Sequence, residues 1–193
     1  MVYAVLLIFF GTISWLAYAV FALDQTAIYA ENAVLESLQV LALIISAMVF
    51  LYALKHSKRE GKLFLLFLSF LCLSFILREV DVEDFDLPSF LIAIGSGTGR
   101  NLILGIGFIG MEIYAAFNFA YYKEAVKAFF RSKAGLLILA AGVLLYLGDL
   151  FENLKTVHHH VFWEETIELS GYMAMLLSAL MLLKEPNTES SES

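Results

Sequence analysis

The chain has 193 residues, of which 61% are apolar and 16% are charged, whereas soluble domains average about 45–50% and about 25%. A soluble domain of this length has too much surface for its volume to bury so many apolar side chains, and the same figures exclude intrinsic disorder. The net charge of −7 argues against a nucleic-acid partner. The single cysteine, Cys72, excludes a disulfide scaffold. The composition therefore predicts an integral membrane protein.

Six stretches are apolar over the roughly 20 residues that a helix needs to cross a bilayer. Their apolar residues run continuously instead of alternating, which favours helices over the strands of a β-barrel. We predict an all-α bundle of six transmembrane helices that forms one domain over residues 1–184, followed by a short polar cytoplasmic tail over 185–193. The expected helices cover 2–23, 33–54, 63–82, 101–122, 135–154 and 164–183.

The first stretch has the position of a signal peptide but not its features. No basic residue precedes it, and its apolar run is about twice the usual length of about 7–15 residues. We therefore interpret it as a retained helix. A second local feature is the segment 88–94 in the loop after the third stretch, where Pro88 favours the start of a short interfacial helix.

Lysine and arginine predict the orientation, because they accumulate in cytoplasmic loops. Both termini are therefore expected in the cytoplasm, with the chain in the plasma membrane or, in a prokaryote, in the inner membrane. The nine basic residues after the second, fourth and sixth stretches are Lys55, Lys58, Arg59, Lys62, Lys123, Lys127, Arg131, Lys133 and Lys184.

Acidic residues gather at the opposite, outer ends of four stretches. A charge at the centre of a spanning helix costs about 2.5–3.5 kcal/mol, and less near its ends, so several at one depth are expected to face one another. The helical spacing agrees, because Glu165, Glu168 and Tyr172 share one face and Glu36 and Gln39 share another. We predict an outward-opening polar pocket lined by the second, third, fifth and sixth helices.

Carboxylates beside histidines are typical ligands of divalent metal ions. The three adjacent residues His158, His159 and His160 cannot all face one ion, and the sequence contains no established metal motif. Two alternatives are a buried network of salt bridges and hydrogen bonds, and a cluster of protonated carboxyl groups. The predicted ligands of a divalent metal ion are Glu36, Glu79, Asp149, Glu152, Glu165, Glu168 and His159, of which Glu36, Asp149 and Glu168 are also the predicted catalytic residues.

A glycine-rich segment, 95–101, precedes the fourth stretch. Glycines allow successive backbone N–H groups to form an anion-binding nest before a helix, and Arg100 can hold a phosphate through two hydrogen bonds. The alternative is a flexible linker with an ordinary helix cap. The predicted substrate-binding residues are Arg78, Arg100, Gly97, Gly99, Asn101, Gln39 and Tyr172.

The spacing of Gly105, Gly107 and Gly110 matches a dinucleotide-binding fingerprint, but it lies inside a membrane stretch with no strand before it. We interpret these glycines as sites of close helix packing. No histidine lies within a stretch to serve as a haem ligand. Neither a nucleotide nor a haem cofactor is therefore expected.

These observations favour a metal-dependent enzyme, a hydrolase, that acts at the outer leaflet on a lipid or phosphate-bearing substrate. One alternative is a non-catalytic membrane subunit or sensor whose polar network is structural. Another is a cation or proton transporter that uses Glu112, because a carboxylate at mid-membrane is a functional candidate by default.

The predicted orientation can be tested with reporter fusions. We expect a C-terminal green fluorescent protein to be fluorescent, because it stays in the cytoplasm, and alkaline phosphatase fused after Asp86 or Val157 to be active. A phosphatase fused after His56 is the control and should be inactive. Active phosphatase at His56 with inactive fusions at the other two positions would reverse the predicted topology.

Overall fold

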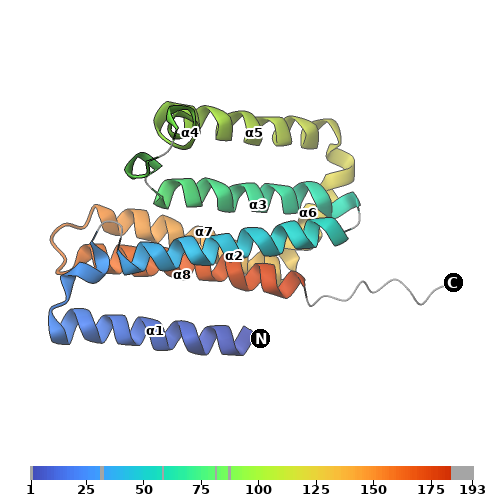
Figure 1. Cartoon of the computed structure of the whole chain (residues 1–193). Helices are drawn as coiled ribbons and strands as arrows, with labels where there is room; N and C mark the ends of the chain where they lie inside the picture. Colours follow the sequence, from blue (N-terminus) through green and yellow to red (C-terminus); the bar gives the residue numbers. More distant parts are fainter. Residues whose placement is uncertain (1, 31–32, 58, 81, 87, 184–193) are drawn as a thin grey trace. The chain divides into compact units, whose positions relative to one another are not determined.

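A computed structural model of the chain describes residues 2–30, 33–57, 59–80, 82–86 and 88–183 (Figure 1). Every regular element in these ranges is helical, which confirms the all-α prediction. Six of the described helices are long and apolar enough to cross a membrane, as in a multi-pass membrane protein. The predicted polar tail, 185–193, lies outside the described residues.

The long helices follow from continuous apolar sequence without an internal proline, since Pro88 and Pro186 both lie outside them. Their ends differ from the predicted ends by a few residues at most positions. The short helix expected at 88–94 is present and begins directly after Pro88. The helices are α1 (Val2–Leu23), η1 (Thr26–Tyr29), α2 (Val34–His56), α3 (Arg59–Glu79), η2 (Val82–Asp84), α4 (Ser89–Gly95), α5 (Gly97–Phe117), α6 (Phe119–Arg131), α7 (Lys133–Glu152) and α8 (His160–Leu182).

The fourth predicted helix, 101–122, is interrupted at Asn118. The Asn118 side-chain amide donates a hydrogen bond to the main-chain oxygen of Tyr114 at 2.9 Å. The main-chain oxygen of Asn118 accepts hydrogen bonds from the backbone N–H groups of Tyr121 and Tyr122. Asparagine competes in this way with regular helical hydrogen bonds. The helix α5 therefore ends here and α6 begins, where the sequence prediction had a continuous span followed by a loop.

The chain forms two compact units. Unit 1 combines Met1–Ala42 with Lys133–Ser193 and contains α1, η1, the first part of α2, α7 and α8. Its apolar core joins Leu16 and Val20 of α1 to Leu35 of α2 and to Phe162 and Leu169 of α8. Unit 1 therefore packs helices from the first and last parts of the sequence, α1, α2 and α8, around one core.

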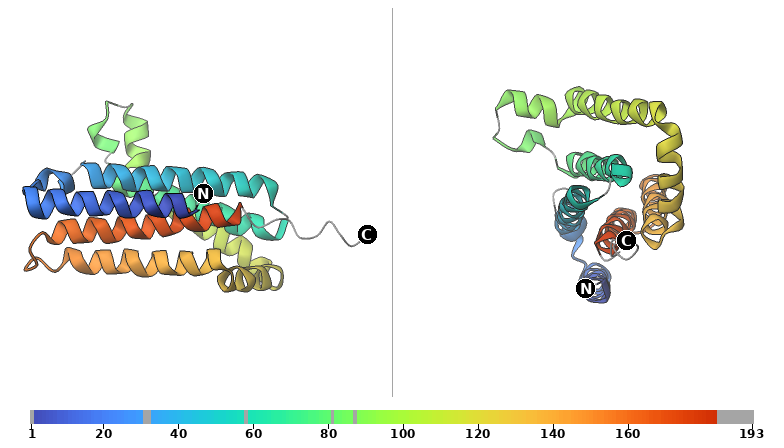
Figure 2. Two further views of the ribbon diagram at one scale, coloured as in Figure 1. Left: turned by 90° about the horizontal axis from the view of Figure 1, so that it is seen from below. Right: turned by 90° about the vertical axis from the view of Figure 1, so that its right-hand side faces the viewer.

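The helices α7 and α8 of unit 1 run side by side (Figure 2). A methyl group placed at Gly148 would lie 2.6 Å from Cγ of Glu168, and one at Gly171 would lie 3.0 Å from Cδ2 of Leu145. Further along, the Ser178 hydroxyl donates to a carbonyl oxygen of α7 at 2.9 Å. Small residues and a hydrogen bond thus permit close approach of the two helices, as is common in membranes.

Unit 2, Leu43–Ser132, contains the remainder of α2 together with α3 to α6. Here α5 packs against α3, where the rings of Phe70 and Phe108 lie 4.9 Å apart. A methyl group at Gly107 would lie 2.6 Å from Cε1 of Phe70, whereas at Gly105 and Gly110 it would meet no atom within 4 Å. Close helix packing therefore explains one of the three glycines of the apparent fingerprint.

Replacing Gly107 with alanine is expected to destabilise the protein by about 1–3 kcal/mol, because the added methyl group overlaps the Phe70 ring. Gly110→Ala, on the same helix, is the matched control. Both variants gain the same helix propensity, so the difference in their thermal unfolding midpoints isolates the contact with Phe70. Equal midpoints would contradict this packing.

Candidate functional site

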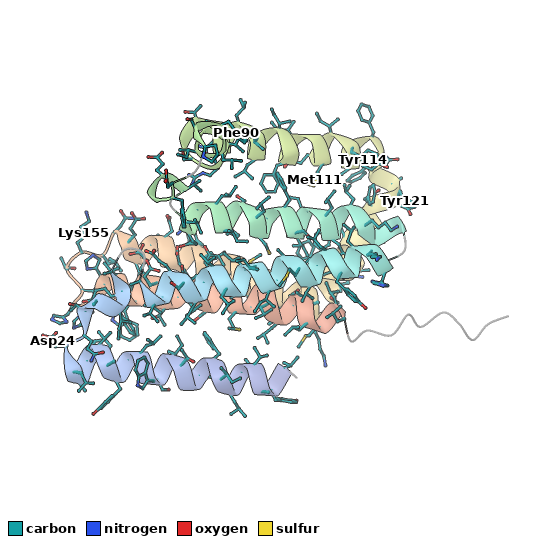
Figure 3. The ribbon with its side chains drawn as sticks, in the orientation of Figure 1. Asp24, Phe90, Met111, Tyr114, Tyr121 and Lys155 are labelled. Carbon is teal, nitrogen blue, oxygen red and sulfur yellow. The ribbon has the colours of Figure 1, made fainter. Side chains whose placement is uncertain are left out.

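The predicted carboxylates of unit 1 lie at one end of that unit. The end of α1 and the start of α2 meet the end of α7 and the start of α8 there, and Asp24 and Lys155 mark it in Figure 3. Glu36 is in the first turn of α2, and the predicted ligands of α7 and α8 lie within a few turns of the same end. The topology therefore places these residues at a similar level along the helices.

The best-defined contact in this region joins Gln39 of α2 to Glu165 of α8. The Gln39 Nε2 atom donates hydrogen bonds to the Glu165 main-chain oxygen at 3.0 Å and to the Glu165 Oε2 atom at 2.7 Å. Gln39 is completely buried, with 0% exposure, although its side chain is polar. The two predicted site residues are thus brought together and link α2 to α8.

Glu168 and Tyr172 lie further along α8 and are also buried, with exposures of 2% and 0%. The Glu168 side chain occupies space that Gly148 of α7 leaves by having no side chain. A larger residue at position 148 would overlap the Glu168 side chain, so this packing requires glycine there. Glu168 is therefore part of the packing between α7 and α8.

Two side-chain oxygen atoms of α2 and α8 are buried without a hydrogen-bond partner among the described residues. They are Oε1 of Gln39 and Oγ1 of Thr166, the residue that follows Glu165. The Gln39 oxygen is left over because Nε2 of the same amide takes both acceptors of Glu165. An unsatisfied buried polar group costs about 1–3 kcal/mol, so these two oxygens are positions where a hydrogen-bond donor or a cation would be stabilised.

Asp149 and Glu152, in the last turn of α7, are exposed instead of buried with Gln39 and Glu168. His159 has a structural role at the start of α8, where it adopts a positive φ of 54°. Its Nδ1 atom lies 2.8 Å from the Tyr29 hydroxyl, and its ring packs edge-on against Phe21 at 5.2 Å.

The described residues contain no group of three or more His, Cys, Asp or Glu side chains with a geometry that could hold a metal ion. The metal site predicted from Glu36, Glu79, Asp149, Glu152, Glu165, Glu168 and His159 therefore stays a prediction. The same holds for the catalytic roles of Glu36, Asp149 and Glu168. What the structure adds is that Glu165 and Glu168 already take part in helix packing.

The other predicted site residues belong to unit 2. The Arg100 Nη1 atom donates to the Leu77 carbonyl oxygen at 2.6 Å, near the C-terminal end of α3. Such a contact satisfies a carbonyl group that lacks a partner within the helix. Arg78 is half-exposed, with its Nε atom 3.5 Å from Oε1 of Glu79. Both arginines thus have protein partners, and their role toward a phosphate stays a prediction.

The glycine-rich segment forms the corner between α4 and α5. Gly97 has a φ of +49°, a conformation that favours glycine. A methyl group at Gly99 would overlap the Ala93 carbonyl group. Tight turning therefore accounts for both glycines, while Asn101 is exposed on the first turn of α5. Anion binding by this corner stays a prediction.

Sequence reasoning did not identify Thr166, Gly148 or Tyr29. Thr166 directly follows Glu165 and Gly148 directly precedes Asp149, so both lay beside predicted residues. Their importance depends on neighbours in other helices, which a single sequence does not reveal. Tyr29 lies in η1, a short element with no periodic signal.

The contact between Gln39 and Glu165 can be measured with a double-mutant cycle of Gln39→Leu and Glu165→Ala in purified protein. Hydrogen bonds between membrane helices average about 0.6 kcal/mol and reach about 1.7 kcal/mol, so we expect a coupling energy in this range from thermal or denaturant unfolding. A control cycle of Gln39→Leu with Glu152→Ala should be additive within about 0.5 kcal/mol. Additive effects in the first cycle would show that the contact contributes nothing.

Comparisons of the chain with protein-family models, with curated proteins and with solved structures found no match. Function must therefore be inferred from the chemistry of the described residues.

Proposed function

We propose that the chain is a non-catalytic membrane protein, a sensor or a subunit of a larger membrane assembly, whose polar residues at one end of unit 1 serve helix packing. The observation that carries this proposal is the pair of hydrogen bonds from the buried Gln39 to Glu165. The burial of Glu168 against Gly148 adds to it.

A structural role for these polar groups has a physical reason. Lipid chains are as apolar as leucine, so apolar contacts alone give little preference for one helix face over another. Among the described residues, the buried Gln39 amide has its acceptors on α8. This favours one rotation of α2 about its axis, because a rotation that turns Gln39 away from α8 breaks both hydrogen bonds. The polar residues thus specify which helix faces meet.

We further infer that the six long helices cross the bilayer with both termini in the cytoplasm of a plasma or inner membrane. The basic residues after α2 and along α6 support this orientation. With that orientation, the Gln39–Glu165 contact belongs to the extracytoplasmic half of the helices. The polar groups then lie close to the outer aqueous phase, where a sensor would meet its signal.

A second candidate function is the metal-dependent hydrolase acting on a lipid or phosphate-bearing substrate. The observation that favours it is that two buried oxygens lack a hydrogen-bond partner among the described residues: Gln39 Oε1, whose amide contacts the Glu165 carboxylate, and Thr166 Oγ1. Hard divalent cations take carboxylate, amide and hydroxyl oxygens as ligands. An ion held there would supply the Lewis acid of a hydrolase.

Thermal unfolding with and without divalent cations separates the two functions. For a non-catalytic protein we expect the unfolding midpoint to be unchanged by a chelator and by Mg²⁺, Ca²⁺, Mn²⁺ or Zn²⁺, and to fall in Gln39→Leu because the helix contact is lost. A bound ion at about 100 times its Kd stabilises by about 2.7 kcal/mol, which is about 5–10 °C for a chain of this length.

Thr166→Val is the decisive variant, because valine matches the shape of threonine and removes only the oxygen. If a cation raises the midpoint of the wild type but not that of Thr166→Val, the hydrolase is favoured and the non-catalytic proposal fails. Ser37→Ala, which removes an exposed hydroxyl on α2, is the matched control and should behave like the wild type. Metal analysis of the purified protein gives an independent measurement.

A further inference from the structure

Unit 2 contains a pocket of about 310 Å³ between α3, α5 and α6. Phe64 and Phe67 line it from α3, Met111 and Glu112 from α5, and Phe130 from α6. Figure 3 labels Met111 on the side of α5 that faces α3. The volume is at the lower end of the range of about 300–1,000 Å³ that is usual for small-molecule sites. The pocket lies within one unit, so its lining is defined by that unit alone.

Glu112 is the only charged residue among the described residues that line this pocket. The other lining residues are apolar apart from the tyrosine Tyr122, which is largely buried. None of the described basic side chains forms an ion pair with Glu112. Glu112 itself is exposed, so its carboxylate is not enclosed by the pocket. Within a bilayer an exposed carboxylate is costly unless it is paired with a cation or a hydrogen-bond donor. The lining therefore favours an apolar body, and the exposed Glu112 favours a positive charge next to it.

The aromatic side chains that line the pocket also favour a positively charged ligand. The ring of Phe64 lies 4.3 Å from that of Phe129 and 5.9 Å from that of Phe130, so these rings support one another across α3 and α6. The faces of aromatic rings attract cations, especially where water is excluded. Carboxylate and rings together favour a ligand with a positive nitrogen and an apolar body.

We propose that this pocket binds a hydrophobic amine, a molecule with one apolar body and one protonated nitrogen, whose N–H group donates to the Glu112 carboxylate. A fatty acid would bring a second negative charge to Glu112, and a phospholipid would bring a phosphate. A neutral lipid would leave the carboxylate unpaired. Charge complementarity therefore selects the amine, and this inference is independent of the function proposed for unit 1.

The test uses the full-length protein in nanodiscs and three probes of nearly equal size: 4-phenylbutylamine, 4-phenylbutanol and 4-phenylbutyrate. Equilibrium dialysis against empty nanodiscs corrects for partition into lipid. We expect the amine to bind at least about tenfold more tightly than the alcohol, since a charge-assisted hydrogen bond gives a factor of this order. The carboxylate probe should not bind detectably.

Glu112→Gln keeps the shape of the side chain and removes its charge. It should weaken amine binding about tenfold or more while leaving binding of the alcohol nearly unchanged. Glu124→Gln is the matched control, because Glu124 is an exposed carboxylate on α6 whose partner is Lys127, and it should bind like the wild type. Ala115→Phe fills the pocket from α5 and should abolish binding of both amine and alcohol.

A measurement on the wild type keeps the test decisive even if a variant does not fold. An aryl-azide derivative of the amine should label peptides from α3, α5 and α6 on illumination, and excess 4-phenylbutylamine should prevent the labelling. Equal affinities for amine and alcohol would overturn the proposal. So would an undiminished preference for the amine in a folded Glu112→Gln variant, or labelling confined to other helices.

Discussion

The constraint on which this structure depends is that polar groups in an apolar environment must find partners within the protein. For the backbone, the solution is the long uninterrupted helix, in which every interior N–H and C=O group is paired along the same segment. Helix ends are where this solution fails, and the chain places its special residues there. Asn118 bonds to both adjoining helices, and Arg100 satisfies a carbonyl group near the end of α3.

The same constraint governs the polar side chains. Gln39 and Glu165 pair with each other, and the Ser178 hydroxyl pairs with a carbonyl group of α7. Space for such contacts comes from small residues, as at Gly148 beside Glu168. Two groups in unit 1 do not meet the requirement within the described residues, Gln39 Oε1 and Thr166 Oγ1. In the Gln39 amide, Nε2 has two hydrogen-bond partners and Oε1 has none among the described residues. This difference distinguishes the region from ordinary helix packing.

Much of the fold follows from the sequence because a continuous apolar run over about 20 residues has few alternatives to a helix. The first helix begins and ends where the sequence predicts, at Val2 and Leu23. The break at Asn118 could not be predicted with the same ease, because asparagine is tolerated within helices. Its effect depends on whether its side chain or the regular helical backbone groups make the local hydrogen bonds.

The candidate site was predictable only in part, for a related reason. Helical spacing singled out Gln39 and Glu165, which the structure joins by hydrogen bonds, but spacing within one helix does not say which face of another helix lies opposite. The exposure of Asp149 and the engagement of His159 by Tyr29 both depend on such tertiary neighbours. A single sequence therefore indicates how far along each helix the polar residues lie, but it does not show which of them contact one another across helices.

The discontinuity of unit 1 has a consequence for biogenesis. Its first part is synthesised before Leu43–Ser132 and its last part after it, and ribosomes add only about 5–20 residues per second. Unit 2 is contiguous, so it can assemble while the C-terminal helices are still being translated. During that interval the Gln39 amide has no acceptor from α8, so the contact between α2 and α8 forms only after α8 has been translated.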